Sequence, residues 1–235
     1  MRKLWISLLC LEATGLAAAP SAQPHGDRIF TYVQAEQFEY RSAKSDTLSW
    51  DVRGWTGGDY DRLWFKTQGD DGIDGPVEDA EVQLRYSRLV TPFWDLAVGA
   101  RYDVKPDPSR AYAVFALHGL GTYRYEVDAD LFVSEEGDVS ARIEVEYPLL
   151  LTQKLILQPS FQLDLTVQEV EELRIGPGLS QVELGLRLRY EIVREFAPYV
   201  GFVWERQVGR TADLARDGGT EFDIPAFVAG VRFWF

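Results

Sequence analysis

The stretch TYRYEVDADLFVSEEGDVSARIEVEYPLL, residues 122–150, alternates between apolar and polar side chains on both sides of the turn-forming segment 134–138. The apolar positions are Tyr123, Tyr125, Val127, Ala129, Leu131, Val133, Ala141, Ile143, Val145 and Tyr147. The charged positions between them are Arg124, Glu126, Asp128, Asp130, Arg142, Glu144 and Glu146. A period of two places successive side chains on opposite faces of a β-strand. The stretch therefore predicts two antiparallel strands, each with one apolar and one charged face.

The same alternation continues through most of the chain from about residue 28, and helical spacing is almost absent. Turn signals divide this region into about twelve segments of roughly ten residues each. The segments are residues 28–40, 47–55, 60–67, 78–87, 93–103, 110–120, 122–133, 139–150, 154–166, 179–191, 196–207 and 224–235. The first and third alternate poorly, so a count of ten is the alternative. An all-β fold is expected in either case.

Composition narrows the classes of protein further. The chain has 235 residues, of which 46% are apolar, and a formal net charge of −13. This charge repels phosphate backbones, so nucleic acid is excluded as a partner and cations are favoured. No window approaches the roughly 18 consecutive apolar residues that a membrane-spanning helix requires. A helical membrane protein is therefore excluded.

The N-terminus has the pattern of a secretory signal peptide. Arg2 and Lys3 precede a short apolar run, residues 4–11, and a stretch of mostly small residues, 15–21. We expect residues 1–21 to be cleaved, which removes the single Met and the single Cys, Cys10. The exported chain then has no Cys and depends on packing or on closed backbone hydrogen bonding for its stability.

Two classes of exported all-β protein fit the alternation. A soluble sandwich or lipocalin-like barrel buries its apolar face, whereas a transmembrane barrel turns that face to lipid. The connections favour the second class, because long ones (69–77, 167–178, 208–223) follow odd-numbered segments and short ones (121, 151–153, 192–195) follow even-numbered segments. The apolar face also becomes aromatic at strand ends, as interfacial girdles require, at Tyr102, Tyr147, Tyr190 and Trp204.

The chain also stops on Phe235 at the end of an alternating segment, which resembles the C-terminal signal of outer-membrane barrels. We therefore predict an antiparallel up-and-down transmembrane β-barrel of about twelve strands, with both termini on the periplasmic side. Residues 28–235 form this barrel, in contact with outer-membrane lipid. Residues 22–27 form a short periplasmic segment between the signal peptide and the first strand.

In such a barrel the charged face lines the lumen. The residues expected there are Asp51, Arg53, Arg62, Lys66, Glu81, Arg85, Asp95, Arg101, residues 124–130 and 142–146 at alternate positions, Gln158, Asp164, Glu183, Arg187, Arg189, Glu205 and Arg232. Twelve strands enclose a narrow space, so long side chains of opposite sign can pair across it. The simplest interpretation is a packed polar plug.

One cluster of charges allows a more specific prediction. A turn centred on Glu136 places Asp130 opposite Arg142, Asp128 opposite Glu144, and Glu126 opposite Glu146. Like charges directly opposed are destabilising unless something compensates. A turn at residues 119–122 sets Ala116 and Val114 beside these acids and His118 near Arg124, while Gln158 and Ser160 flank the other side. The acids either form a hydrated cation site with His118 or, the interpretation we favour, are neutralised by Arg187 and Arg189 across the lumen.

Other candidate residues carry weaker signals. His118 alone is more typical of a hydrogen-bonded lumen residue than of a ligand, and His25 is either incidental or an N-terminal copper contact. The acidic connections (Asp70, Asp71, Asp74, Glu78 and Asp79; Glu169, Glu171 and Glu172) are solvated loops or attract divalent cations. An enzyme is not predicted, because no Ser is placed beside His118 and no phosphate-binding loop or Cys/His metal spacing is present.

Four segments resemble the copper resistance protein B family of Gram-negative outer membranes. They are LSWDVRGWTGGDYDRLWFKTQGD (48–70), TPFWDLAVGARYDVKPDPSRAYAVFALHGL (91–120), LLTQKLILQPS (150–160) and GLSQVELGLRLRYEIVREFAPYVGFVWERQVGRTADLARDGG (178–219). The resemblance implies an outer-membrane barrel that acts in copper tolerance, binds or passes copper ions, and works with a periplasmic multicopper oxidase of the same system.

Members of the family commonly carry an N-terminal extension rich in Met and His, whereas residues 22–27 contain His25 and no Met. We therefore expect copper to meet carboxylates, His118 or His25, which suit Cu(II) better than Cu(I). The candidate metal ligands are His118, Glu126, Asp128, Glu144, Glu146 and His25. The alternative is a structural or general narrow-pore barrel without specific metal binding.

Overall fold

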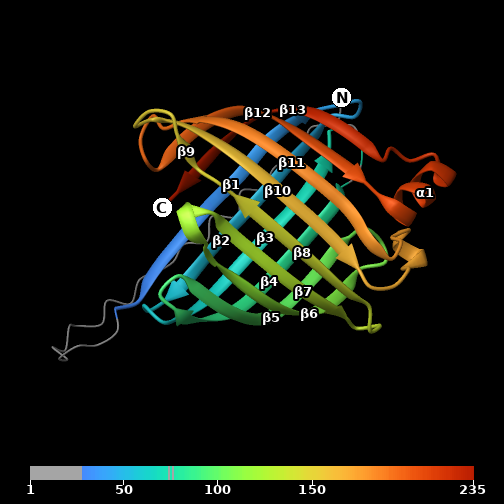
Figure 1. Cartoon of the computed structure of the whole chain (residues 1–235), viewed down its shortest axis with the longest axis horizontal. Coiled ribbons are helices and arrows are strands. Elements are labelled where there is room, and N and C mark those ends of the chain that lie inside the picture. Colours follow the sequence, from blue (N-terminus) through green and yellow to red (C-terminus); the bar gives the residue numbers. More distant parts are fainter. Residues whose placement is uncertain (1–27, 74, 76) are drawn as a thin grey trace, which may run out of the picture.

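The computed structural model describes residues 28–235 except Asp74 and Pro76, and it is a closed antiparallel β-barrel (Figure 1). The strands are β1 (Phe30–Ser42), β2 (Thr47–Gly57), β3 (Asp61–Gly72), β4 (Val77–Thr91), β5 (Trp94–Lys105), β6 (Arg110–Leu120), β7 (Glu126–Ser134), β8 (Val139–Glu146), β9 (Leu149–Leu150), β10 (Leu155–Thr166), β11 (Gly178–Tyr190), β12 (Phe196–Gln207) and β13 (Asp223–Trp234). Consecutive strands pair with each other, except that β8 and β9 both pair with β10, and β13 pairs with β1 to close the barrel.

The barrel has twelve strands rather than ten. The two-residue β9 continues β8 beyond a break at Tyr147 and Pro148, and both pair with β10. Closure extends to the last residue, because the Phe235 amide donates to the Val33 carbonyl at 2.9 Å and the Val33 amide donates back to Phe235 at 3.0 Å. Each strand lies at or near one of the segments expected from the alternation.

A β-bulge in β1 explains why the first segment alternates poorly. The pairing of β1 with β2 shifts register between Ala35 and Gln37, so that Glu36 is an additional residue in the strand. A bulge inserts one unpaired residue and reverses the alternation beyond it. The lumen-facing residues are therefore Gln34 and Glu36 up to the bulge, and Gln37 and Glu39 after it. Phe38 stays outside, with 45% of its surface exposed.

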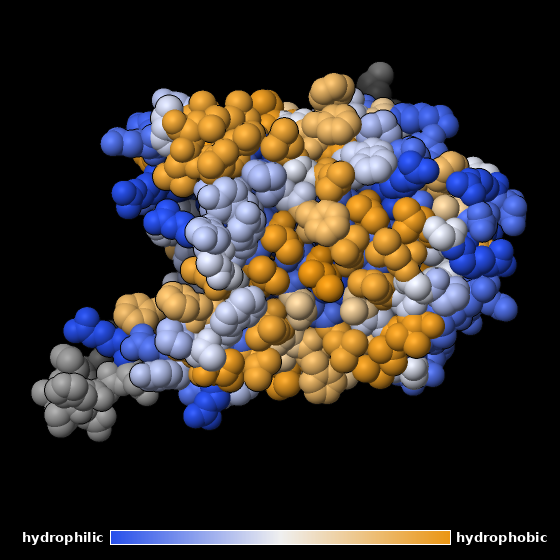
Figure 2. All heavy atoms as spheres, viewed as in Figure 1, coloured by the Kyte–Doolittle hydropathy of each residue, from blue (hydrophilic) through white to orange (hydrophobic). Residues whose placement is uncertain are grey.

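The apolar face lies on the outside, as a transmembrane barrel requires and a soluble sandwich does not. Leu84, Leu96, Phe115 and Val200 are between 50% and 59% exposed, whereas Gln83 and Ser87, on the opposite face of β4, are completely buried. Figure 2 shows apolar side chains in a broad band over the strands and hydrophilic ones gathered at the end that carries the helix α1. The barrel therefore presents an apolar surface to lipid and keeps its polar groups inside.

The two ends of the barrel differ, as expected. Short turns lie at the end that holds the C-terminus, and one of them contains the 3-10 helix η1 (Thr122–Arg124). The opposite end carries η2 (Glu171–Leu173) and the α-helix α1 (Gly209–Gly218), which packs through Ala212 and Ala215. Neither helical segment follows from the alternation. No helix in the described part of the chain has both the length and the apolar character needed to cross a membrane.

Two expected boundaries were wrong. The long connection 69–77 is mostly strand, since β3 continues to Gly72 and Asp70 and Asp71 pair with β4. Residues 122–125 do not begin a strand, because Tyr123 and Arg124 take positive φ angles of 65° and 69° in the turn before β7. Arg124 is therefore exposed in a turn rather than part of the lumen wall.

Candidate functional site

Ion pairs cross the lumen between strands that are not neighbours in the sheet. Arg187 on β11 donates from Nε and Nη2 to the two carboxylate oxygens of Glu39 on β1, at 3.0 and 2.9 Å. The Glu39 carboxylate also accepts hydrogen bonds from Tyr199 Oη and Arg41 Nε, both at 2.9 Å. Since Glu39 is completely buried, this cluster fills its part of the lumen.

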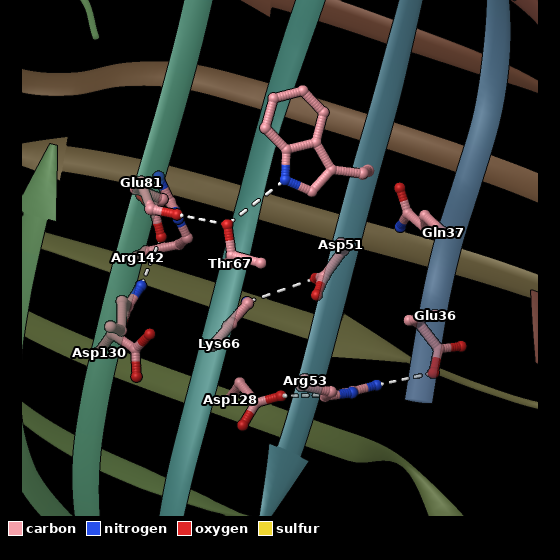
Figure 3. A network of polar contacts seen from close by, with 12 residues as sticks. Glu36, Gln37, Asp51, Arg53, Lys66, Thr67, Glu81, Asp128, Asp130 and Arg142 are labelled. Carbon is pink, nitrogen blue, oxygen red and sulfur yellow. Dashed lines mark hydrogen bonds and ion pairs between the residues drawn. The ribbon is translucent and has the colours of Figure 1, made fainter. Parts of the chain in front are cut away.

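A second cluster is centred on Arg53 of β2 (Figure 3). Arg53 Nη2 donates to Glu36 Oε2 at 2.9 Å, and Arg53 Nη1 lies 3.8 Å from Asp128 Oδ2 on β7, across the barrel. Arg232 Nε lies 2.9 Å from the other oxygen of Glu36. Arg53 therefore links three strands, of which β7 lies on the opposite wall.

A third cluster joins β4 and β5 to β7 and β8. Arg85 forms two hydrogen bonds with Asp130, of 2.9 and 2.6 Å. Arg101 Nη2 lies 2.7 Å from the buried Glu81 carboxylate, and Arg142 Nη1 lies 3.5 Å from the same oxygen. Long side chains of opposite sign do pair across the lumen, as the sequence predicts for a polar plug.

The lumen widens toward the long-loop end into a cavity of about 750 Å³. Its walls carry more carboxylates than cationic side chains. The carboxylates are Asp51, Asp70, Glu78, Asp79, Asp103, Glu144, Asp164, Glu183, Glu205 and Glu221, and the cationic residues are Arg41, Lys44, Arg101, Arg142 and Arg174. The cavity is therefore acidic in formal charge and suits cations better than anions.

The expected acid pairs on β7 and β8 are in register. Glu126 lies opposite Glu146, Asp128 opposite Glu144, and Asp130 opposite Arg142. Ser160 flanks Glu146 on the other side. A tight turn fixes the register of the strands it joins, which is why residues 134–138 were sufficient to place these partners.

The expectation that Arg187 and Arg189 neutralise the acid pairs was wrong. Arg187 is bound to Glu39, and Arg189 Nη1 donates to the Gln158 side chain at 2.7 Å. Gln158 in turn donates to Glu146 Oε2 at 2.8 Å, so Arg189 contacts that carboxylate only through an amide. Arg53 is the arginine that reaches the acid pairs, since it lies 3.8 Å from Asp128. The register along a sheet does not indicate which side chains face each other across the lumen.

His118 lies opposite Asp128, not near Arg124. The turn between β6 and β7 includes residues 121–125, so the pairing shifts from the expected one and Val114 faces Phe132 instead of an acid. On its other side, His118 is paired with Asp95 of β5, and the His118 Nε2 to Asp95 Oδ2 distance is 3.5 Å. Asp95 is therefore a neighbour of the candidate site, although it was not among the ligands expected from the sequence.

Aromatic side chains line the lumen near His118, a feature that the sequence interpretation missed. Consecutive ring contacts link Trp234 to Tyr32, Tyr32 to Trp55, Trp55 to Trp64 and Trp64 to His118, with centroid distances of 5.7, 6.3, 6.2 and 5.2 Å. The signal was present, because Trp55 and Trp64 share the lumen-facing alternation of Arg53 and Arg62. We call these four aromatic residues the aromatic arc.

Within the described residues, no three His, Cys, Asp or Glu side chains are close enough together to hold a metal ion. His25 and Asp74 lie outside the described residues. Of the acidic loop residues, Glu172 is ion-paired, because Arg110 Nη2 lies 2.5 Å from its carboxylate. Arg110 also binds Glu136 and Asp138, at 3.0 and 2.7 Å, so it joins the tight turn 134–138 to the long loop 167–177.

The closed barrel, its apolar exterior and its polar lumen define a protein of the outer membrane. Solved structures agree on the fold. The NanC porin aligns with a TM-score of 0.56 at 14% identity over 87% of this chain and 99% of that chain. The KdgM porin, solved in complex with disordered oligogalacturonate, aligns with a TM-score of 0.52 at 9% identity over the same shares.

The chain belongs to the copper resistance protein B family. The family model, described as copper resistance protein B precursor, matches residues 29–235. Copper resistance protein B of Escherichia coli is 42% identical over 212 residues, which are 90% of this chain and 71% of the relative. The copper resistance protein B homolog of Pseudomonas syringae pv. tomato is 41% identical over 91% of this chain and 72% of the relative. The family and the fold are those of porin-like outer-membrane barrels.

Proposed function

We propose that this outer-membrane barrel contributes to copper tolerance by binding Cu(II) in its lumen or passing it through. The observation that carries the proposal is the alignment of His118 between Asp95 and Asp128 on three adjacent strands. Imidazole nitrogen and carboxylate oxygen are ligands that suit Cu(II). Two copper resistance proteins among its relatives support the choice of metal.

The proposed ligands extend from His118 along β7 and β8. The set comprises His118, Asp128, Glu144, Glu126 and Glu146, to which the structure adds Asp95. His25, which lies outside the described residues, is a further candidate. A bound dication offsets the repulsion between the opposed acid pairs, since like charges directly opposite each other are unfavourable. Small side-chain rotations are required, because no three of these groups are already gathered in the described residues.

The barrel acts in this proposal by binding and transfer, not by catalysis. A periplasmic multicopper oxidase is its proposed partner, as the copper relationship of the family suggests. A general narrow-pore barrel without specific metal binding is the second candidate. The ion-paired lumen favours it, since Arg53 already lies 3.8 Å from Asp128.

Calorimetric titration of the refolded protein with Cu(II) separates these two functions. We expect the wild-type protein to bind and the variant Glu126→Gln/Asp128→Asn/Glu144→Gln/Glu146→Gln to bind at least about tenfold more weakly, as loss of several ligating charges predicts. A control with four exposed carboxylates replaced, Asp59, Asp107, Glu195 and Asp217, should bind like the wild type. Equal binding by both variants, or none by the wild type, contradicts the lumen site.

A growth assay tests the cellular role. Deletion of the gene should lower the copper concentration that cells tolerate, and the wild-type gene should restore it while the four-acid variant should not. Unchanged tolerance after deletion favours the general barrel instead.

A further inference from the structure

A row of seven polar side chains, five of them carboxylates, runs around the lumen wall from one end of the barrel to the other. Its members are directly paired from strand to strand, in the order Asp95, His118, Asp128, Glu144, Gln162, Glu183 and Glu205. We call this set the acid row. Directly opposed side chains on neighbouring strands are about 5 Å apart at Cβ. Each member is therefore a neighbour of the next.

The acid row climbs along the barrel, because strands in a closed barrel are tilted and staggered. Asp95 is the second residue of β5, directly after a short turn, and Glu205 lies two residues before the end of β12, at the long-loop end. The four members nearer the long-loop end, which we call the upper members, line the 750 Å³ cavity; they are Glu144, Gln162, Glu183 and Glu205. The three lower members continue the row beyond the cavity, toward the short turns.

The adjacent rows have a different composition. The row on the long-loop side, Ala97, Ala116, Asp130, Arg142, Asp164 and Gln181, contains an arginine between two acids. The row on the other side, Glu126, Glu146, Ser160, Gly185 and Val203, loses its charge after two residues. The acid row contains no Lys or Arg, unlike the first of these rows, and its carboxylates continue as far as β12, unlike those of the second.

A buried carboxylate oxygen without a hydrogen-bond partner lies at the lower end of the acid row. Asp95 is only 8% exposed, yet its Oδ1 has no hydrogen-bond partner within the described residues, and the same is true of Nε2 of His118. The other carboxylate oxygen, Oδ2, lies 3.5 Å from His118 Nε2 and 3.7 Å from Arg62 Nη1, so Asp95 contacts both the row and β3. Buried polar atoms are rarely left unsatisfied, and a hydrated ion is one group that supplies such a partner.

We propose that the acid row is a path for hydrated cations, along which an ion passes from one carboxylate pair to the next between the cavity and the short-turn end. Three arginines approach the acid row from strands outside it: Arg41 of β1 lies 3.7 Å from Glu183, Arg53 of β2 lies 3.8 Å from Asp128, and Arg62 of β3 lies 3.7 Å from Asp95. The inference rests on the proposed function in taking Cu(II) as one such cation. Selectivity for cations over anions follows from the path alone and does not depend on copper binding.

The reversal potential of the refolded barrel in a planar lipid bilayer under a potassium chloride gradient tests the path. The variant Glu183→Gln/Glu205→Gln removes two carboxylates of the row that are not among the proposed copper ligands. Glu205 has no ion-pair or hydrogen-bond partner among the described residues, and Glu183 has only Arg41, at 3.7 Å, so the fold should survive. Comparison of heated and unheated samples of the variant on a denaturing gel checks that the barrel is folded.

We expect the wild-type barrel to prefer potassium over chloride, and the variant to lose about fivefold of that preference for each carboxylate removed, the effect of a unit charge at about 4 Å in water. The control Asp59→Asn/Asp217→Asn, with two exposed carboxylates removed, should behave like the wild type. A wild-type barrel without conductance or with anion preference overturns the path, as does a variant with unchanged selectivity.

Cu(II) titration of the same protein distinguishes this failure from failure of the proposed function. If Cu(II) binds at the lower end and the selectivity is unaffected by Glu183→Gln/Glu205→Gln, the path is wrong and the copper site stands. If the variant loses selectivity while the wild-type barrel does not bind Cu(II), the path stands and the proposed function is wrong.

Discussion

Glu39 and Arg187, separated by 148 positions in the chain, face each other across the barrel and form two hydrogen bonds of 2.9 and 3.0 Å. Their strands, β1 and β11, are separated in the sheet by β12 and β13. The pair therefore joins two parts of the wall that no backbone ladder connects, and it does so with a carboxylate that is completely buried.

The first prediction concerns this pair. Replacement Glu39→Gln leaves Arg187 and Arg41 without their shared carboxylate, and breaking a buried ion pair costs about 3–5 kcal/mol. We expect the free energy of unfolding in urea, measured in lipid vesicles, to fall by this amount. Lys44→Gln, which breaks the exposed pair with Glu221, should cost less than about 1 kcal/mol. Equal losses in both variants would show that the buried pair is not special.

The second prediction concerns Arg53, which competes with a cation for Asp128. Arg53→Gln removes a positive charge 3.8 Å from the Asp128 carboxylate. Since a unit charge at about 4 Å contributes about 1 kcal/mol even in water, Cu(II) affinity should rise about fivefold or more. Titration of Arg232→Gln is the control, because Arg232 also pairs with Glu36 but forms no ion pair with Asp128 among the described residues. A fall in affinity for Arg53→Gln would contradict the competition.

The third prediction uses the aromatic arc as a reporter. Trp64 contacts the His118 ring edge-on at 5.2 Å, so Cu(II) bound to His118 should quench Trp64 fluorescence strongly. We expect Trp64→Phe to remove most of the copper-dependent quenching. Trp204→Phe, which alters a tryptophan at the far end of β12, should leave the quenching almost unchanged. Quenching that is independent of Trp64 would place the copper elsewhere.

The fourth prediction concerns Arg110, which binds carboxylates of the tight turn 134–138 and of the long loop 167–177 at distances of 2.5–3.0 Å. Arg110→Gln should release both loops while leaving the strand ladders intact. Limited proteolysis should then cleave within residues 135–138 or 167–177 several times faster than in the wild type. Arg210→Gln, which breaks only the exposed contact with Glu169, should be cleaved at the wild-type rate. Unchanged cleavage in Arg110→Gln would show that the loops are held by other contacts.

The number of strands and much of the register were predictable, because alternation and tight turns are local properties. Residues 134–138 form a tight turn, so the pairs Glu126 with Glu146 and Asp128 with Glu144 followed from counting. The same counting misplaced His118, since Tyr123 and Arg124 adopt left-handed backbone angles that lengthen the preceding turn. Positive φ at non-glycine residues is uncommon and has no reliable sequence signal.

Contacts across the lumen were beyond the sequence. Arg187 and Arg189 were expected beside the acid pairs, and Arg53 is there instead. Which side chains meet across a barrel depends on the tilt and stagger of all its strands, and these are global quantities. The acid row lies between these two cases. It takes one member from each of seven strands, so it can be recognised only once the register of every strand pair is known.

The bulge at Glu36 lets a single strand serve two separate charge clusters. Without the additional residue, the alternation that turns Gln34 and Glu36 inward would turn Glu39 outward, toward lipid. The cell would then have to insert a barrel with a bare carboxylate on its hydrocarbon-facing surface and with Arg187 lacking its partner. One inserted residue thus keeps a carboxylate off the lipid-facing surface of β1 and places it where it binds β11.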